Sequence, residues 1–336
     1  MISLADVYHV VTATVPLYVT MFLAYISVKW WKLFNPEQCS GINKFVANFS
    51  VPILSFQVIS SNNIYKMSLK LVYADVVQKL LAFLVFTAII RIKGRGGLKW
   101  IITGLSLSTL PNTLILGIPL MKAMYRDEAS LLLPQIIFLQ SMVWYNLLLF
   151  LHELDAAIPA RTMPVVAPPS QDTGESETSL EIQSKEEEEE EAEHRTQSLI
   201  WASIHFRWGV DMPDVVNQSI EILASGGLGM ATFSLGLFMA SNNRVIVCGP
   251  RMTLVAMGLK FLVGPAIMAV ASIVIGLRDR MLKVAIIQAA LPQGIVPFVF
   301  AREYNVNPGI LSTGVLLGML MALPVALTYY LLLSLY

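Results

Sequence analysis

The sequence predicts an all-α integral membrane protein, built from two inverted repeats of five helices in which two helices are broken where they cross. Three observations predict this fold: an apolar composition, a series of apolar runs near membrane-spanning length, and matched proline interruptions in the two halves. Of 336 residues, 55% are apolar and only 14% are charged. About a quarter of the residues are charged in an ordinary soluble domain, so most of this chain faces something other than water.

The composition also excludes several classes of function. Lys and Arg number 23 and Asp and Glu number 23, so the balance of charge indicates no nucleic-acid partner. The two cysteines, Cys39 and Cys248, provide neither a disulfide framework nor a metal-ligand pattern. There is no Ser/His/Asp order and no phosphate-binding glycine loop. We therefore expect neither an enzyme nor a bound metal or cofactor.

Apolar runs near the ~20 residues needed to cross a bilayer divide the chain. We expect spans near residues 7–31, 39–61, 69–92, 98–124, 127–154, 213–240, 251–276, 280–303 and 307–335. No basic n-region precedes the first run and no small-residue cleavage site follows it, which favours a retained span over a signal peptide.

A polar tract separates the two sets of spans. It contains a Pro-rich stretch, a Ser/Thr-rich patch and an unbroken run of glutamates at 186–191, a composition that cannot bury a core. The apolar segment at 198–206 that follows is too short to cross a bilayer alone. We therefore expect a first helical repeat at 1–154, an acidic disordered loop at 155–197, and a second repeat at 198–336 with its first helix, the sixth overall, truncated.

The two repeats share an interrupted helix. The first half reads Leu-Pro-Asn-Thr at 110–113 and the second reads Leu-Pro-Gln-Gly at 291–294. When each repeat crosses the membrane an odd number of times, the two repeats insert in opposite orientations. Such an inverted repeat is the usual plan of secondary transporters. Pro111 and Pro292 each remove a helix hydrogen bond, and in lipid the freed backbone groups must find partners or line a wet cavity.

These broken helices predict a binding site for an anion. Half-helix N-termini carry unpaired N–H groups and a partial positive charge. The amides of Asn112 and Gln293 are further hydrogen-bond donors beside them. The alternative is a pair of ordinary proline kinks, which are common in membrane helices.

Buried charges mark a second place of interest. Asp75 and Lys79 are four residues apart in the third apolar run, so they share one helix face and can pair. Ionisable groups at bilayer depth are costly and usually functional, although a pair near a helix end can simply anchor a span. Lys260 occupies a similar place in the second half without a carboxylate at the matching offset.

The fifth apolar run adds polar and aromatic side chains on one side of its helix, at Gln140, Trp144 and Tyr145. Aromatic residues in membrane helices serve more often in packing or at the interface than in ligand binding. Both interpretations stay open at this point.

Several long contiguous stretches are distinctive of one transporter family. They are Val15-Pro16-Leu17-Tyr18-Val19, Asn43-Lys44-Phe45-Val46, Leu110-Pro111-Asn112-Thr113-Leu114, Gly227-Leu228-Gly229-Met230-Ala231, Phe233-Ser234-Leu235-Gly236-Leu237-Phe238-Met239-Ala240 and Gln288-Ala289-Ala290-Leu291-Pro292-Gln293-Gly294. On these stretches the sequence resembles the PIN-FORMED auxin efflux carriers of plants, over nearly its whole length outside the acidic loop.

The resemblance implies a substrate, a mechanism and a location. The substrate would be the auxin anion, indole acetic acid, carried by elevator-like alternating access in a fold of ten helices. A scaffold would mediate a homodimer surrounded by membrane lipid. The short loop is similar to that of members in the endoplasmic reticulum membrane, with the plasma membrane as the alternative. The shortened sixth helix departs from the family.

The resemblance also implies roles for particular residues. The substrate-contacting positions of the family correspond here to Asn112, Ser55, Ile115, Gln140 and Tyr145, beside the crossover residues Pro111, Pro292 and Gln293. The family's support site resembles Asp75 with Lys79.

Three functions therefore remain as hypotheses from different classes. The first is a carrier of the auxin anion driven by voltage and gradient. The second is a proton- or sodium-coupled carrier of organic anions with similar architecture. The third is a truncated partner of full-length carriers that does not itself transport.

Overall fold

The computed structural model describes residues 4–60, 67–94, 97–160, 213–241 and 246–335. These residues form helices without a strand, and one isolated antiparallel bridge joins Pro111 to Gln293. The elements are α1 (Leu4–Lys29), α2 (Pro36–Phe45), η1 (Val46–Ser50), α3 (Val51–Ser60), α4 (Leu69–Lys93), α5 (Leu98–Thr109), η3 (Thr113–Gly117), α6 (Ile118–Leu139), η4 (Gln140–Trp144), α7 (Tyr145–Ala160), α9 (Asp214–Ser241), α10 (Pro250–Gly258), η5 (Leu259–Val263), α11 (Gly264–Ile275), α12 (Asp279–Ala289), α13 (Ile295–Glu303) and α14 (Pro308–Ser334).

The predicted multi-pass membrane architecture is confirmed. Within the described ranges, seven continuous helical stretches are long and apolar enough to cross a bilayer. The predicted spans at 98–124 and 280–303 are each divided into two shorter helices, because the chain leaves the helix at the proline interruptions. A sharp turn at Arg126, with φ 48° and ψ −120°, separates the predicted spans at 98–124 and 127–154.

Four short π-helical segments, η1, η3, η4 and η5, lie inside these spans. A π-helical turn widens the helix locally and is common at functional sites. In the first case η1 ends two residues before Pro52, which has no backbone N–H to donate.

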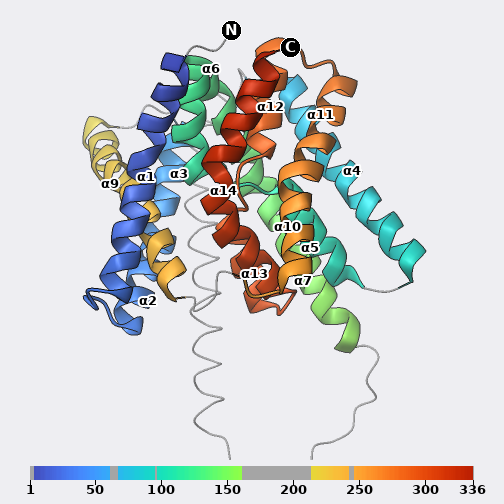
Figure 1. Ribbon diagram of the computed structural model, residues 1–336, viewed down its shortest axis with the longest axis horizontal. Helices are drawn as coiled ribbons and strands as arrows, with labels where there is room; N and C mark the ends of the chain where they lie inside the picture. Colours follow the sequence, from blue (N-terminus) through green and yellow to red (C-terminus); the bar gives the residue numbers. More distant parts are fainter. Residues whose placement is uncertain (1–3, 61–66, 95–96, 161–212, 242–245, 336) are drawn as a thin grey trace, which may run out of the picture.

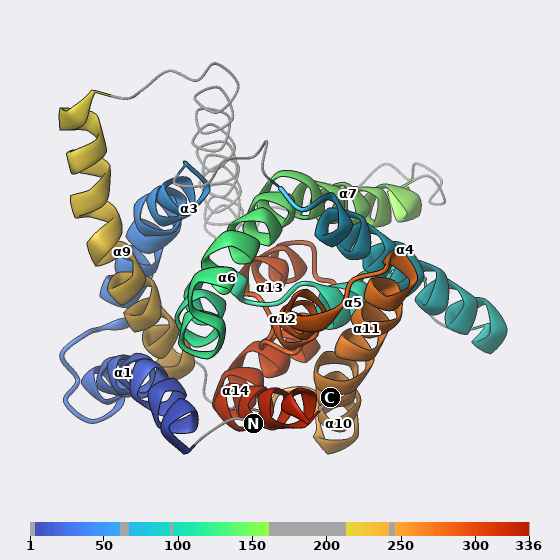
Figure 2. The same ribbon diagram turned by 90° about the horizontal axis from the view of Figure 1, so that it is seen from above.

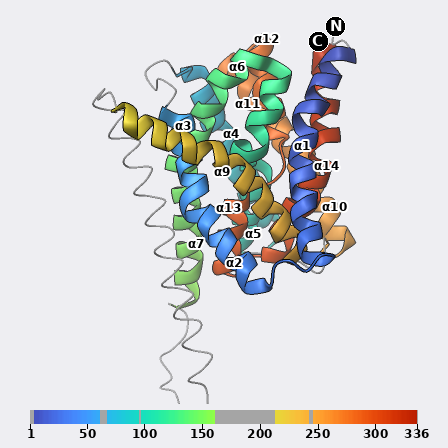
Figure 3. The same cartoon turned by 90° about the vertical axis from the view of Figure 1, so that its left-hand side faces the viewer.

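The helices form two groups (Figures 1 and 2). α9 crosses α1, α2 and α3 obliquely (Figure 3), and these four helices make one group. The other contains the broken helices together with α4, α7, α10 and α11, and the two groups meet along α6 and α14. A Cβ on Gly236 of α9 would lie 2.2 Å from the carbonyl oxygen of Met21 in α1, so this close crossing requires glycine.

The predicted repeat boundaries are only partly within the described residues. α7 continues to Ala160, six residues beyond the expected end of the first repeat at 154. Asp155 lies in this extension and pairs with Lys99 of α5 at 4.0 Å. The remainder of the acidic loop and the shortened sixth helix lie outside the described residues. The ends of the chain lie at one end of the bundle and α7 ends at the other (Figure 1).

Candidate functional site

The two proline-broken segments meet in the interior of the protein. The Asn112 N–H donates to the Pro292 carbonyl at 2.8 Å, and the Gly294 N–H donates to the Leu110 carbonyl at 3.0 Å. Residues 110–113 and 291–294 are all buried. Each broken helix therefore satisfies part of the other's freed backbone, as groups shielded from water require.

Side-chain amides at this crossing remain without partners. The Asn112 Oδ1 accepts from the Ile115 N–H at 3.4 Å and so caps η3, but Asn112 Nδ2 has no partner. Both amide atoms of Gln293, a fully buried residue, are also unpartnered. Buried polar groups are nearly always hydrogen-bonded in folded proteins. Two free donors beside the N-termini of η3 and α13 therefore form a place where an anionic group can be held.

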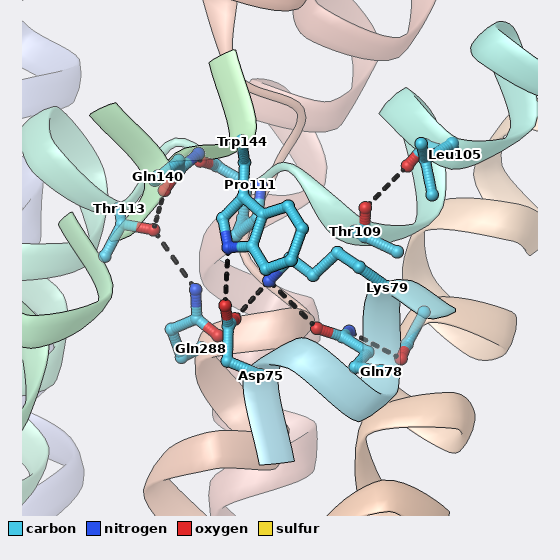
Figure 4. Close-up of polar contacts among 11 residues, drawn as sticks. Asp75, Gln78, Lys79, Leu105, Thr109, Pro111, Thr113, Gln140, Trp144 and Gln288 are labelled. Atoms are coloured by element: carbon cyan, nitrogen blue, oxygen red, sulfur yellow. Dashed lines mark hydrogen bonds and ion pairs between the residues drawn. The ribbon is translucent and has the colours of Figure 1, made fainter. Parts of the chain in front are cut away.

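A network of three side chains supports the crossing from one side (Figure 4). Gln140 Nε2 donates to the Pro111 carbonyl at 2.7 Å. The Thr113 hydroxyl donates to Gln140 Oε1 and accepts from Gln288 Nε2, both at 3.2 Å. Both polar atoms of the Gln140 amide are thus already bonded to protein, which fixes the backbone at the break.

The predicted pair of Asp75 and Lys79 lies beside this network and is buried (Figure 4). Asp75 Oδ1 bonds the Lys79 ammonium, and Asp75 Oδ2 accepts from the Trp144 indole N–H at 2.7 Å. The same ammonium lies 5.3 Å from the centre of the Trp144 ring, within cation–π range. Gln140 and Trp144 are the first and last residues of η4, so this one π-helical turn connects the charge pair with the crossing.

Lys260 lies in η5 and is fully buried, and its ammonium has no hydrogen-bond partner. Lys260 belongs neither to the Asp75–Lys79 ion pair nor to the Lys99–Asp155 ion pair. The second half of the chain thus buries a basic group that takes no part in the charge pair of the first.

Two of the other predicted substrate contacts, Ser55 and Ile115, lie where the two groups of helices meet. Ser55 of α3 and Ile115 of η3 are 6% and 7% exposed. Ile115 belongs to an apolar cluster with Met21 of α1 and Leu235 of α9. Tyr145 is half-buried at the start of α7. Within the described residues, no group of His, Cys, Asp and Glu side chains is arranged to hold a metal ion.

Comparison with known proteins assigns the chain to a family. A family model described as a membrane transport protein matches residues 9–198 and 197–330. The chain is 51% identical to auxin efflux carrier component 8 of Arabidopsis thaliana over the full length of both. It is 40% identical to component 5 of the same plant over 98% of each chain, and 32% identical to probable auxin efflux carrier component 1b of Oryza sativa subsp. japonica over the full length of both. The chain belongs to the PIN-FORMED auxin efflux carrier family.

Membership of the PIN-FORMED family has two consequences for the predictions. Its members are named as carriers, so the chain is a transporter and not an enzyme. The alignment with component 8 is 370 positions long, longer than the chain of 336 residues. That PIN-FORMED relative therefore has residues for which this chain has no counterpart.

Some residues of the site were not predicted from the sequence. Thr113 and Gln288 complete the network at the crossing, and Gln78 accepts from the Lys79 ammonium at 3.3 Å while donating to the Gly264 carbonyl at 3.4 Å. Gln288 lies four residues before Pro292. In an unbroken helix, that spacing would put Gln288 one turn before Pro292 on the same face. This spacing was the signal for Gln288 in the sequence.

Proposed function

We propose that this protein carries the auxin anion, indole acetate, across a membrane, and that the carboxylate binds at the crossing of the two broken helices. The observation that carries the proposal is the set of unpartnered amide atoms on Asn112 and Gln293 in a buried position. A carboxylate would accept from both Nδ2 and Nε2 and would also interact favourably with the two helix N-termini. The names of the relatives supply the substrate.

The remaining predicted residues take supporting roles in this proposal. Ser55, Ile115 and Tyr145 would form the wall for the indole ring, because an aromatic carboxylate needs apolar surroundings and a few placed polar groups. Gln140 would hold the crossing in shape, since both of its amide atoms already bond protein. Asp75, paired with Lys79, would hold η4 through Trp144.

Alternating access would then move one group of helices against the other. α1, α2, α3 and α9 would form the scaffold, and the group that contains the crossing would carry the substrate. We also propose that the scaffold makes a homodimer and that the protein resides in the endoplasmic reticulum membrane, with the plasma membrane as the alternative. These assignments rest on the family resemblance.

The substitution Asn112→Asp tests the binding site directly. Aspartate keeps the Oδ1 acceptor that caps η3 and is a good N-cap residue, but it replaces the Nδ2 donor by a negatively charged oxygen. We expect radiolabelled indole acetate flux in proteoliposomes to be lost while the unfolding temperature is kept. Asn35→Asp is the matched control, because Asn35 caps α2 in the same way at an exposed position. Normal flux in Asn112→Asp would contradict the proposal.

A proton- or sodium-coupled carrier is the second candidate, and the buried charges of Asp75, Lys79 and Lys260 favour it. Flux measured at two membrane potentials and with reversed ion gradients separates the two candidates. Uniport of an anion responds to voltage and to the gradient of the anion itself, but not to a proton or sodium gradient. Coupled transport also responds to the gradient of the coupling ion. Saturable flux with the purified chain alone would exclude the third hypothesis, a partner that does not transport.

A further inference from the structure

A cavity lies close to the proposed binding site and is not part of it. Its volume is about 250 Å³, and it is lined by residues of α3 and of both arms of α6, including Val58, Ile118, Lys122 and Pro134. This volume is just below the about 300–1,000 Å³ of pockets that hold drug-sized molecules. The cavity therefore has room only for a ligand smaller than these.

The turn at Arg126 creates the cavity. It reverses the chain, so that the segment before it and the segment after it run side by side. The Tyr330 hydroxyl of α14 donates to the Met124 carbonyl at 3.2 Å, which fixes the first arm just before the turn. Lys122 on the first arm and Ser130 on the second thereby line one space.

The cavity continues the helix faces that form the proposed site. Val58 follows Ser55 by three residues on α3, and Ile118 follows Ile115 by three residues along η3 and α6. Residues three apart lie on the same face of a helix. Val58 and Ile118 also share an apolar cluster with Leu114, beside the crossing. The turn of α6 lies at the end of the bundle opposite the end of α7 (Figure 1).

The chemistry of the lining suits an aromatic carboxylate. Leu133 and Pro134 are buried and, with Val58 and Ile118, give apolar walls. Lys122 is the basic residue of the lining. It is exposed, and it belongs neither to the Asp75–Lys79 ion pair nor to the Lys99–Asp155 ion pair. A ring between apolar walls with its carboxylate on an ammonium group is a complementary arrangement.

We propose that this cavity is a second, weaker binding site for the same aromatic carboxylate, on the side of the membrane opposite the end of α7. The anion would occupy it on the way between the crossing and the water on that side, with Lys122 holding the carboxylate. The inference rests on the proposed function, because the ligand is the transported anion.

Equilibrium binding of radiolabelled indole acetate tests this proposal on the full chain in nanodiscs of zwitterionic lipid, where anionic headgroups do not compete. We expect two sites. Lys122→Gln should raise the dissociation constant of the weaker site about fivefold, as for an exposed ion pair, and Lys122→Arg should not. Ser130→Leu, which fills the cavity but keeps the charge, should also weaken this site. Lys70→Gln is the control, because Lys70 is an exposed lysine at the start of α4 outside the cavity lining.

The outcomes separate this site from the crossing. Asn112→Asp should remove the stronger site and leave the site that depends on Lys122. If Asn112→Asp instead abolishes all binding, or if Lys122→Gln leaves both dissociation constants unchanged, the second site is refuted and the crossing stands. If Asn112→Asp leaves both sites intact, the proposed function fails while the cavity site stands. Absence of any binding to the unaltered chain would refute both.

Discussion

Replacement of Gly264 by alanine tests how closely the second half of the chain packs against the broken helix of the first. A Cβ at this position would lie 2.2 Å from the carbonyl oxygen of Ser108. Ser108 is the next-to-last residue of α5, just before the break. Carbon–oxygen contacts of this kind normally lie at about 3.3–3.6 Å. The two backbones must therefore separate by about 1 Å, since neither atom belongs to a flexible side chain.

The free energy of unfolding should fall as a result. Overpacking of this kind costs about 1–3 kcal/mol, and the greater helix propensity of alanine offsets about 0.5–1 kcal/mol. The mid-points of these two ranges leave a net loss of about 1 kcal/mol. In a protein larger than a small domain each kcal/mol lowers the unfolding temperature by about 2–4 °C, which thermal unfolding of the purified protein in detergent can resolve.

Gly258 provides the matched control in the same span. It has right-handed helical dihedral angles, φ −62° and ψ −44°, and a Cβ there would meet nothing within 4 Å. Gly258→Ala should therefore leave stability unchanged or raise it by about 0.5–1 kcal/mol. An unfolding temperature of Gly264→Ala equal to that of the unaltered protein, or a shift of the same sign in both variants, would refute the packing argument.

Three further predictions concern the polar groups near the crossing. Asp75→Asn should destabilise the protein by about 3–5 kcal/mol, because it leaves the Lys79 ammonium buried without a counter-charge. Thermal unfolding should show a smaller loss of stability in the double variant Asp75→Asn/Lys79→Met. An equal loss in the single and double variants would contradict the role of the unpaired ammonium. Trp144→Phe keeps a ring beside Lys79 but removes the N–H that bonds Asp75, so we expect a loss of about 1.5–3 kcal/mol in chemical denaturation; no loss would mean that this bond is weak. Gln140→Leu leaves the Pro111 carbonyl without its donor and should cost about 1–3 kcal/mol and reduce indole acetate flux, whereas unchanged flux would exclude a positioning role.

The interruptions of the helices could be predicted from the sequence because proline acts locally. Pro111 and Pro292 each remove a backbone donor wherever they occur in a helix, and their matching contexts indicated that they belong together. The structure places them at one crossing. The pairing of Asp75 with Lys79 was predictable for a similar reason, since a spacing of four residues decides which side chains share a helix face.

Contacts between distant helices could not be predicted in this way. Nothing in the local sequence indicates that the Gln140 amide bonds the carbonyl of Pro111, or that Trp144 bonds Asp75, because these contacts depend on how helices pack. The glycines of α9 illustrate the same limit. Gly229 meets nothing within 4 Å, whereas Gly236 is required by the backbone of α1, and spacing alone does not distinguish them.

The most direct test of the central claim is a structure of this protein with indole acetate bound. The account predicts a carboxylate oxygen within about 2.7–3.2 Å of Asn112 Nδ2, Gln293 Nε2 or both, with the indole ring against Ile115. A carboxylate bound elsewhere, with both of these amide nitrogens still without a partner, would contradict it.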